Sequence, residues 1–268
     1  MEDLKDVIAR LDEDEAREAV KIIHDLLHYS PNLVYHYYSL IPPKYKWPLE
    51  KTRWGLPKLI KKMDGPKIKL PKPDPSHFKK SLPEALVERR SVRRFSREPL
   101  SLELLSTLLY YSLGVKGSTW GIPLRMFPSA GALQPIEAYI QVNNVEGLDA
   151  GIYHYEPDEH MLIELRRGDF RREMYLYSLQ QDHVRDAPLN IILTIVLGRT
   201  ESKYGHRAYR YALLDTGHVG MNIYLVSTAL GLGTCAVGAY YDRDIDSLIG
   251  VDGIEELSII IYPVGYPK

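Results

Sequence analysis

The sequence is poor in cysteine, and this scarcity excludes several kinds of site. Cys235 is the single cysteine in 268 residues, so the chain cannot form an internal disulfide. It also cannot supply the several thiolates of a cysteine-rich zinc site or of an iron–sulfur cluster. Cysteine usage of this kind is compatible with a reducing compartment.

An excess of positive charge and long apolar runs are missing as well. The formal net charge is -1 at pH 7, so no bulk electrostatic attraction to nucleic acid is expected. No uninterrupted apolar run approaches the length that spans a bilayer, and the acidic segment 1–6 lacks the apolar core of a secretory signal. We therefore expect a cytoplasmic protein with no nucleic-acid partner and no membrane partner.

Phenylalanine is rare, whereas tyrosine is abundant. The chain has 4 Phe and 20 Tyr, which indicates many half-buried rings whose hydroxyl reaches water or an interface. The rest of the composition is that of a globular protein with enough apolar residues for a sizeable core. The length fits one large domain, or one domain with an appendage.

The N-terminal part differs in composition from the rest of the chain. Residues 1–30 carry nine acidic and four basic residues, with apolar residues at helical spacing, which predicts an amphipathic helix. Residues 44–80 carry twelve basic residues, three acidic residues and six prolines, which indicates an extended arm. The arm either wraps around its own protein or a partner subunit, or binds an acidic peptide. We expect residues 1–81 to form this helix and arm, and residues 82–268 to form the main domain.

Two histidines on the predicted N-terminal helix have a spacing that could bind a metal ion. His24 and His28 are four residues apart, which places them on one helical face. No third ligand lies nearby in the sequence, so we interpret both as ordinary histidines and predict no metal site.

Hydrophobic periodicity predicts both helices and strands in the main domain. The predicted helices are 83–88, 102–113 with Ser101 as its cap, 169–178, 205–230 and 242–248. The predicted strands are 136–142, 151–155, 161–165, 189–197 and 257–262. Because the run 189–197 is apolar throughout, it predicts a central strand that is covered on both faces. The segment 114–127 is interpreted as a loop.

The longest predicted helix carries a stripe of small residues. Ala208, Ala212, Thr216 and Gly220 follow one another at intervals of four. Such a stripe lets another helix approach closely. It suits either the centre of a domain or a two-fold interface.

Three stretches contain residue types that bind an anion or a flat ring. Residues 89–96 include four arginines and two serines, whose fork-shaped and hydroxyl donors suit a single phosphate. Residues 128–135 are small residues between prolines, and they predict a rigid turn with accessible backbone N–H groups. Residues 231–238 are rich in glycine but lack the spacing of a dinucleotide-binding fingerprint. Considered singly, the first stretch fits the charged end of a surface helix about as well as it fits a phosphate site. The third stretch fits a plain helix-to-strand turn about as well as it fits a ligand site.

Together, the three stretches resemble the signatures of the nitroreductase superfamily. Residues 89–95 are similar to the first signature, and residues 128–135 and 231–238 are similar to the second and third. Further similarities to the SagB-type, or thiazole/oxazole oxidase, branch lie at 128–133, 151–155, 203–211 and 214–218. Members of that branch are flavin enzymes that oxidise azolines in modified peptides to azoles.

The resemblance implies a fold, an assembly and a cofactor. The implied fold is α+β and has three layers, with a mixed, mainly antiparallel sheet flanked by helices. The implied assembly is an intertwined homodimer with two FMN sites. The resemblance covers about residues 82–267 and extends only weakly to residues 1–81.

The resemblance also implies roles for particular residues. At the phosphate and ribityl end of FMN, the implied contacts are Arg89, Arg90, Ser91 and Arg93. Beside the ring, and often across the dimer interface, they are Pro128, Ser129, Ala130, Gly131 and Leu133. On the other side of the ring, they are Cys235, Ala236, Val237 and Gly238. Lys203 and Tyr204 match the Lys-Tyr pair of the azoline oxidases, where a base near the substrate is expected. Arg207 and Arg210 could provide cationic surroundings that lower the pKa of such a base.

Three departures from the branch leave the substrate open. Gln134 stands where many members have an aromatic residue. The basic tail that some members place near the phosphate is reduced to Lys268. No cyclodehydratase domain is fused to this sequence.

The features together predict an FMN-dependent oxidoreductase of the SagB type. It would transfer hydride between flavin and a heterocycle or similar small group, such as an azoline in a peptide. Two alternatives stay open: a general NAD(P)H-dependent reductase of nitro or quinone compounds, and a non-catalytic, flavin-holding partner subunit. The expected partners are a second copy of the chain, a small-molecule or modified-peptide substrate, and NAD(P)H.

Overall fold

A seven-stranded sheet forms the body of the molecule. The computed structural model describes residues 12–28, 31–39 and 58–268. The strand order is β1-β6-β5-β4-β7-β9-β8, and every neighbouring pair of strands runs antiparallel. The strands are β1 Lys67–Lys69, β4 Ile136–Val142, β5 Gly151–Glu156, β6 Met161–Arg167, β7 Leu189–Val196, β8 Gly233–Thr234 and β9 Glu256–Gly265.

The predicted apolar strand occupies the centre of this sheet. β7 pairs with β4 on one side and with β9 on the other. Both β4 and β7 are buried along almost their whole length. Since successive side chains of a strand point to opposite faces, a strand that is buried at every position must be covered from both sides.

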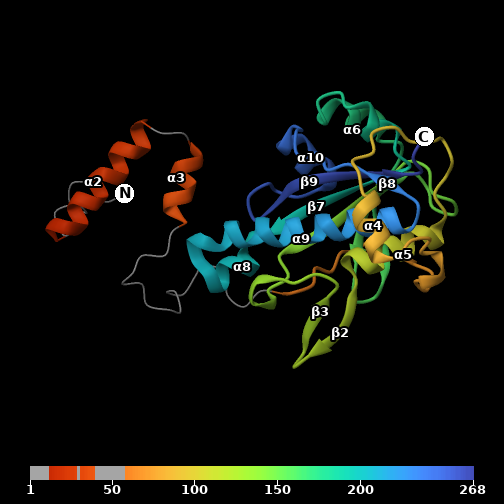
Figure 1. The fold of residues 1–268 in the computed structure, drawn as a ribbon, viewed down its shortest axis with the longest axis horizontal. Coiled ribbons are helices and arrows are strands. Elements are labelled where there is room, and N and C mark those ends of the chain that lie inside the picture. The colour runs from red at the N-terminus through yellow and green to blue at the C-terminus, as the bar shows by residue number, and fades with distance from the viewer. Residues whose placement is uncertain (1–11, 29–30, 40–57) are drawn as a thin grey trace.

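Helices provide this cover and complete three layers (Figure 1). α5 and α9 pack on one face of the sheet, and α6, α7 and α10 pack on the other. The helices are α2 Glu13–His28, α3 Pro31–Tyr38, η1 Pro75–His77, α4 Leu82–Glu88, α5 Leu102–Leu113, η2 Ala130–Ala132, α6 Arg171–Tyr177, α7 Asp182–Asp186, α8 Leu197–Tyr204, η3 Gly205–Arg207, α9 Ala208–Ala229 and α10 Asp242–Ile249, where η marks a 3-10 helix. The predicted α+β class, with a mainly antiparallel sheet between helical layers, is confirmed.

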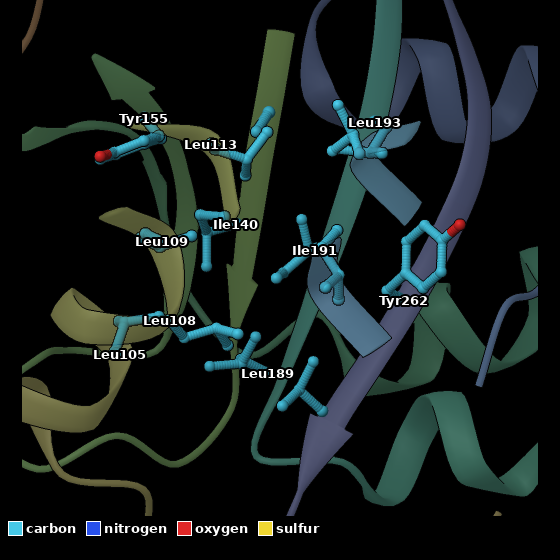
Figure 2. Packing of buried hydrophobic residues seen from close by; sticks show 14 of the residues in the cluster. Leu105, Leu108, Leu109, Leu113, Ile140, Tyr155, Leu189, Ile191, Leu193 and Tyr262 are labelled. Carbon is cyan, nitrogen blue, oxygen red and sulfur yellow. The ribbon is translucent and has the colours of Figure 1, made fainter. Parts of the chain in front are cut away.

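Leucines of α5 pack against the central strands and form the main core (Figure 2). Leu109 is fully buried, and Figure 2 shows it facing Ile140 of β4. The helix begins where predicted because the Ser101 hydroxyl oxygen accepts the N–H of Leu104 at 3.2 Å. The leucine periodicity and this cap together fix which side of α5 faces the sheet.

The small-residue stripe of α9 faces the interior of its own chain. All four of its members are buried, and the stripe consists of Ala208, Ala212, Thr216 and Gly220. A Cβ atom on Gly220 would lie 2.1 Å from Oη of Tyr262 on β9, so glycine is needed for this approach. The stripe therefore serves the centre of the domain, and at Gly220 it brings the helix close to the sheet.

The expected loop at 114–127 is a β-hairpin, so this local prediction was wrong. β2 Val115–Thr119 pairs antiparallel with β3 Ile122–Arg125. Trp120 and Gly121, with φ of 48° and 77°, form the two-residue turn between them. Gly117 and Pro123 obscured the pattern because both residue types are depleted in strands.

Besides this hairpin, the sequence predictions did not include α3, α7, α8, β1 or the short η1. α8 follows β7 directly and ends at Tyr204, and the short η3 then leads into α9. The helix predicted at 205–230 is therefore η3 and α9 together. Lys203 and Tyr204 consequently lie at the end of a helix.

The described part of the basic arm, residues 58–80, lies along its own chain. β1 adds an edge strand beside β6. Nζ of Lys62 pairs with the buried carboxylate of Glu156 at 2.9 Å. These contacts agree with the wrapping interpretation of the arm. Residues 44–57 of the arm lie outside the described residues, and the domain boundary after residue 81 stays a prediction.

Leu109→Ala tests the core between α5 and the sheet. The substitution leaves a cavity at a fully buried position, and should lower the free energy of unfolding by about 2–5 kcal/mol. Leu176→Ala on α6 is the matched control, because Leu176 is 41% exposed and should lose less than about 1 kcal/mol. Urea unfolding followed by circular dichroism measures both. Equal losses in the two variants would contradict the packing described.

Candidate functional site

The first and third stretches meet at a tyrosine of α9. Oη of Tyr224 lies 3.1 Å from the hydroxyl of Ser91 and accepts the N–H of Ala236 at 2.8 Å. The guanidinium of Arg89 lies over the same ring, 5.3 Å from its centroid. Tyr224 was not among the residues predicted from the sequence, because a half-buried tyrosine on a long helix carries no local signal of this role.

Backbone contacts join the same two stretches. Ser91 and Thr234 form a parallel bridge, and the N–H of Val92 donates to the carbonyl of Thr234 at 2.9 Å. A Cβ atom on Gly233 would lie 2.6 Å from the Val92 side chain, so only glycine permits this approach. The arginine-bearing segment therefore runs directly beside the glycine-rich segment.

Exposure alternates along the predicted contacts 235–238. Cys235 and Val237 are buried, whereas Ala236 and Gly238 are exposed. A Cβ atom on Gly238 would meet nothing within 4 Å, so open space lies in front of its backbone. A ligand at this segment would meet Ala236 and Gly238 directly and would be supported by the two buried residues.

The predicted phosphate-end residues separate into two groups. Arg89 and Ser91 come together at Tyr224. Arg93 is exposed near α7, where burial and the charge of Arg93 both lower the pKa of His183. Arg90 instead lines a separate cavity of about 330 Å³, so the structure does not bring it to Tyr224.

The turn 128–135 meets both residues of the predicted catalytic pair. Three residues of the turn have positive φ, namely Gly131 (61°), Ala132 (57°) and Gln134 (51°). A Cβ atom on Gly131 would lie 2.7 Å from Oη of Tyr204 and 2.9 Å from Nζ of Lys203. Both side chains therefore converge on Gly131, which is itself exposed. Pro128 is exposed beside it, whereas Ser129, Ala130 and Leu133 are partly buried.

A buried carboxylate of α9 anchors one end of this turn. Asp215 is 3% exposed and accepts the N–H of Ala130 at 3.1 Å. Burial raises the pKa of Asp215, and hydrogen bonds from Ser129 and Ala130 partly offset this rise. In the sequence, Asp215 stood out only as a member of the stretch 214–218, and its contact with the turn is visible only in the structure.

A buried ion pair holds the other end of the turn. Arg199 of α8 donates from Nη1 to the carbonyl of Gln134 at 2.7 Å, and its Nη2 pairs with Glu137 at 2.5 Å. The second oxygen of Glu137 lies 3.0 Å from Nε2 of His154. Burial by itself raises the pKa of Glu137, but Arg199 and His154 outweigh it and lower the pKa to about 2. Sequence reasoning missed this pair because its members lie on different elements.

Arg207 and Arg210 contact the N-terminal helix α3. Arg207 donates to the carbonyl of Ser39 at 2.7 Å, and Arg210 donates to the carbonyl of His36 at 3.2 Å. Nε of Arg207 also donates to Oη of Tyr211 at 2.9 Å. In the described structure these guanidiniums hold α3 against the start of α9, which is a different role from the predicted cationic surroundings of Lys203.

Two kinds of feature are absent from the described residues. No three His, Cys, Asp or Glu side chains within 12–28, 31–39 and 58–268 gather closely enough to hold a metal ion. Within the same ranges, no helix combines the length and the apolar character that crossing a membrane requires.

Comparison with known proteins identifies the family. A model described as "Nitroreductase family" matches residues 86–266. A Methanocaldococcus jannaschii protein, provisionally described as a nitroreductase, is 36% identical over 201 residues, which are 75% of this chain and 98% of that protein. The chain therefore belongs to the nitroreductase family, whose members are typically FMN-dependent oxidoreductases.

A second relative has a more specific description. The trifolitoxin-processing protein TfxB of Rhizobium leguminosarum bv. trifolii is 29% identical over 175 residues, which are 62% of this chain. The alignment covers 47% of TfxB, so this chain spans about half the length of that relative.

Solved structures show the same fold. A Ralstonia eutropha protein, also provisionally described as a nitroreductase, has a TM-score of 0.65 at 27% identity, covering 82% of this chain and 97% of that one. A chain of the Escherichia coli microcin synthetase McbBCD complex, solved with truncated pro-MccB17 bound, has a TM-score of 0.60 at 21% identity, covering 97% of this chain and 96% of that one. The second likeness concerns the fold alone.

The Glu137–Arg199 pair makes the stability of the fold depend on acidity. The folded pKa of about 2 lies below the ordinary value of 4.5, so the folded state binds this proton more weakly than the unfolded state. About 3 kcal/mol of stability is therefore present above pH 4.5 and is lost as the pH falls toward 2. Glu137→Gln should reduce the loss of stability between pH 5 and pH 3. Urea unfolding at a series of pH values measures it, and an unchanged slope would contradict the assignment.

Proposed function

We propose that the chain is an FMN-dependent dehydrogenase that transfers hydride between flavin and a heterocycle or similar small group, such as an azoline in a peptide. The observation that carries this proposal is the convergence of Lys203 and Tyr204 on the exposed Gly131. A peptide substrate is supported by the description of TfxB as trifolitoxin-processing.

The residues around Tyr224 fit an FMN. Arg89 offers a charged planar fork and Ser91 a hydroxyl, a donor set that suits a phosphate group. Ala236 and Gly238 offer exposed backbone that a flat ring can approach closely. When bound, FMN would supply the two-electron redox chemistry that no amino-acid side chain of this site provides.

Lys203 and Tyr204 supply the proton chemistry in this proposal. Converting an azoline to an azole removes a ring proton together with a hydride, so a base must lie beside the substrate. Nζ of Lys203 or Oη of Tyr204 would accept that proton. Burial raises the pKa of Tyr204, which disfavours its phenolate form and makes Lys203 the stronger candidate. Asp215 holds the turn on which the pair converges, and a fixed turn keeps base and substrate in reacting geometry.

We further propose a homodimer in which each flavin site uses both copies. Asp215 and Tyr224 are nine residues apart on α9, which is about 2.5 turns, so they lie on opposite sides of the helix. A single chain therefore presents the turn and the arginine-bearing stretch on different sides of α9. Leu214 and Met221 of α9 are 57% and 43% exposed, and Val87 of α4, which packs against α9, is 86% exposed. An apolar surface of this kind suits a two-fold interface.

A general NAD(P)H-dependent reductase of nitro or quinone compounds is the second candidate. It is supported by the 36% identical relative, which is provisionally described as a nitroreductase. Such a reaction needs the flavin end of the site but no base at Gly131. The effect of replacing Lys203 therefore separates the two candidates. A flavin-holding subunit without activity of its own is the third, and it would bind FMN but turn over neither kind of substrate.

The flavin end is tested by Arg89→Ala and Tyr224→Phe. The first removes the guanidinium over the Tyr224 ring and should abolish retention of FMN during purification. The second removes two hydrogen bonds, each worth about 1 kcal/mol, and should weaken FMN binding by about tenfold or more. Tyr241→Phe, at a 55% exposed position, is the control. Fluorescence titration of apoprotein with FMN gives the affinities. Wild-type affinity in Arg89→Ala would refute the phosphate site.

The catalytic end is tested by Lys203→Ala with a synthetic azoline-containing peptide. Loss of a general base should reduce azoline oxidation by about 100-fold or more while FMN stays bound. Turnover of NADPH with a quinone should change little, and Lys116→Ala on the exposed β2 strand should change neither activity. Liquid chromatography with mass detection follows the loss of two hydrogens. Undiminished azoline oxidation in Lys203→Ala would show that the base is wrongly assigned.

A further inference from the structure

A cluster of buried charges beneath the turn 128–135 is not used by the proposed chemistry. Arg199 and Glu137 are 3% and 1% exposed, and His154 is fully buried. Burying an ion pair costs desolvation energy that a well-packed apolar pair would not incur. Stability alone is therefore a weak explanation for this pair, and its contacts point to another role.

Arg199 and Lys203 act on the same turn from one helix. They are four residues apart on α8, so their side chains lie on one face of it. Arg199 reaches the carbonyl of Gln134 at the end of the turn, and Lys203 reaches Gly131 near its middle. The position of the turn relative to Lys203 is thus linked to the bond that Arg199 makes.

The turn requires such a bond because its backbone is strained. Ala132 and Gln134 have φ of 57° and 51°, a region that side-chain-bearing residues rarely adopt. Backbone of this kind persists only where its surroundings over-determine it. The surroundings here include Arg199 at Gln134 and the hydroxyl of Ser129, which accepts the N–H of Gln134 at 3.0 Å.

Glu137 orients the guanidinium of Arg199, and the basic arm in turn contacts Glu137. One oxygen of Glu137 meets Arg199 and also accepts the backbone N–H of Lys61 at 3.2 Å. The other oxygen faces His154. Nζ of Lys61 pairs with the carboxylate of Glu256 at 2.5 Å, which fixes the arm at this point. Because Nη2 of Arg199 is held by Glu137, the neighbouring Nη1 is directed to the carbonyl of Gln134.

We propose that Arg199, oriented by Glu137, is a positioning residue that holds the turn 128–135 in the conformation in which Gly131 meets Lys203 and Tyr204. The consequence for turnover rests on the proposed function. The positioning itself is a property of the chain and can be measured without a substrate.

The double variant Arg199→Met, Glu137→Leu tests the positioning. It removes both members of the ion pair together. Circular dichroism checks that the fold is retained, because Glu137 also stabilises the charge of the buried Arg125. Hydrogen exchange with mass spectrometry reads the amides of Ala132 and Leu133, which bond within the turn. They should exchange at least about tenfold faster than in the wild type, because one charge-assisted hydrogen bond is lost. Arg199→Lys, which keeps the charge but not the fork, should give a smaller increase.

A matched control separates positioning from general stability. Arg166→Met removes another arginine-to-carbonyl bond, to Leu248 at 3.0 Å, on a different part of the molecule. It should leave the turn amides unchanged. Wild-type exchange of the turn amides in the double variant would overturn the proposal. Equal acceleration in the α5 peptides and in the turn would also overturn it, because it would show that the pair supports the fold as a whole.

A double-mutant cycle tests the consequence for the reaction. With the azoline peptide, Arg199→Met should lower kcat by about tenfold or more and change KM little. In a Lys203→Ala background it should cause no further loss of kcat, since its effect acts through Lys203. Additive losses would overturn the link to Lys203. If the wild type does not oxidise the azoline, the proposed function fails, while the exchange measurement still decides the positioning.

Discussion

The close approach of α9 to the sheet is the contact on which both ends of the candidate site depend. Gly220 lies against Tyr262 at a distance that a Cβ atom would prevent, and the other small residues of the stripe are buried along the same helix. From that position, Asp215 holds the turn on one side of the helix. Tyr224 joins the arginine-bearing and glycine-rich stretches on the other side. A bulkier residue at the stripe would displace the supports of both stretches at once.

The second organising feature is a row of buried carboxylates across the sheet. Glu137 of β4, Glu156 of β5 and Glu256 of β9 are nearly inaccessible, and a buried carboxylate is costly unless it is paired. Arg199 of α8 pairs with the first, while Lys62 and Lys61 of the basic arm pair with the other two. The arm therefore satisfies charges that belong to the sheet, and it touches the same network that supports the turn. This explains in physical terms why a segment rich in lysine and proline follows the body so closely.

Membership of the nitroreductase family establishes the fold and the general chemistry, and the fold alone does not choose a substrate. What directs the proposal toward a dehydrogenase is local: an amine and a phenol converge on an exposed glycine beside a rigid turn. A reductase of nitro or quinone compounds has no need of a base at that place. The distinction between the candidate functions thus rests on Lys203 and on the residues that position it.

Local patterns in the sequence were enough to predict much of the fold. The leucines and the Ser101 cap predicted α5, the apolar run predicted β7 as the central strand, and the composition of three stretches indicated the residue types of the candidate site. The hairpin at 115–125 was not predictable in this way, because glycine and proline weaken its strand pattern. Tyr224, and the pairing of Arg199 with Glu137, emerged only from the folded chain. Each depends on elements that are distant in sequence, and a side chain's own neighbours in the chain carry no information about which element will pack against it.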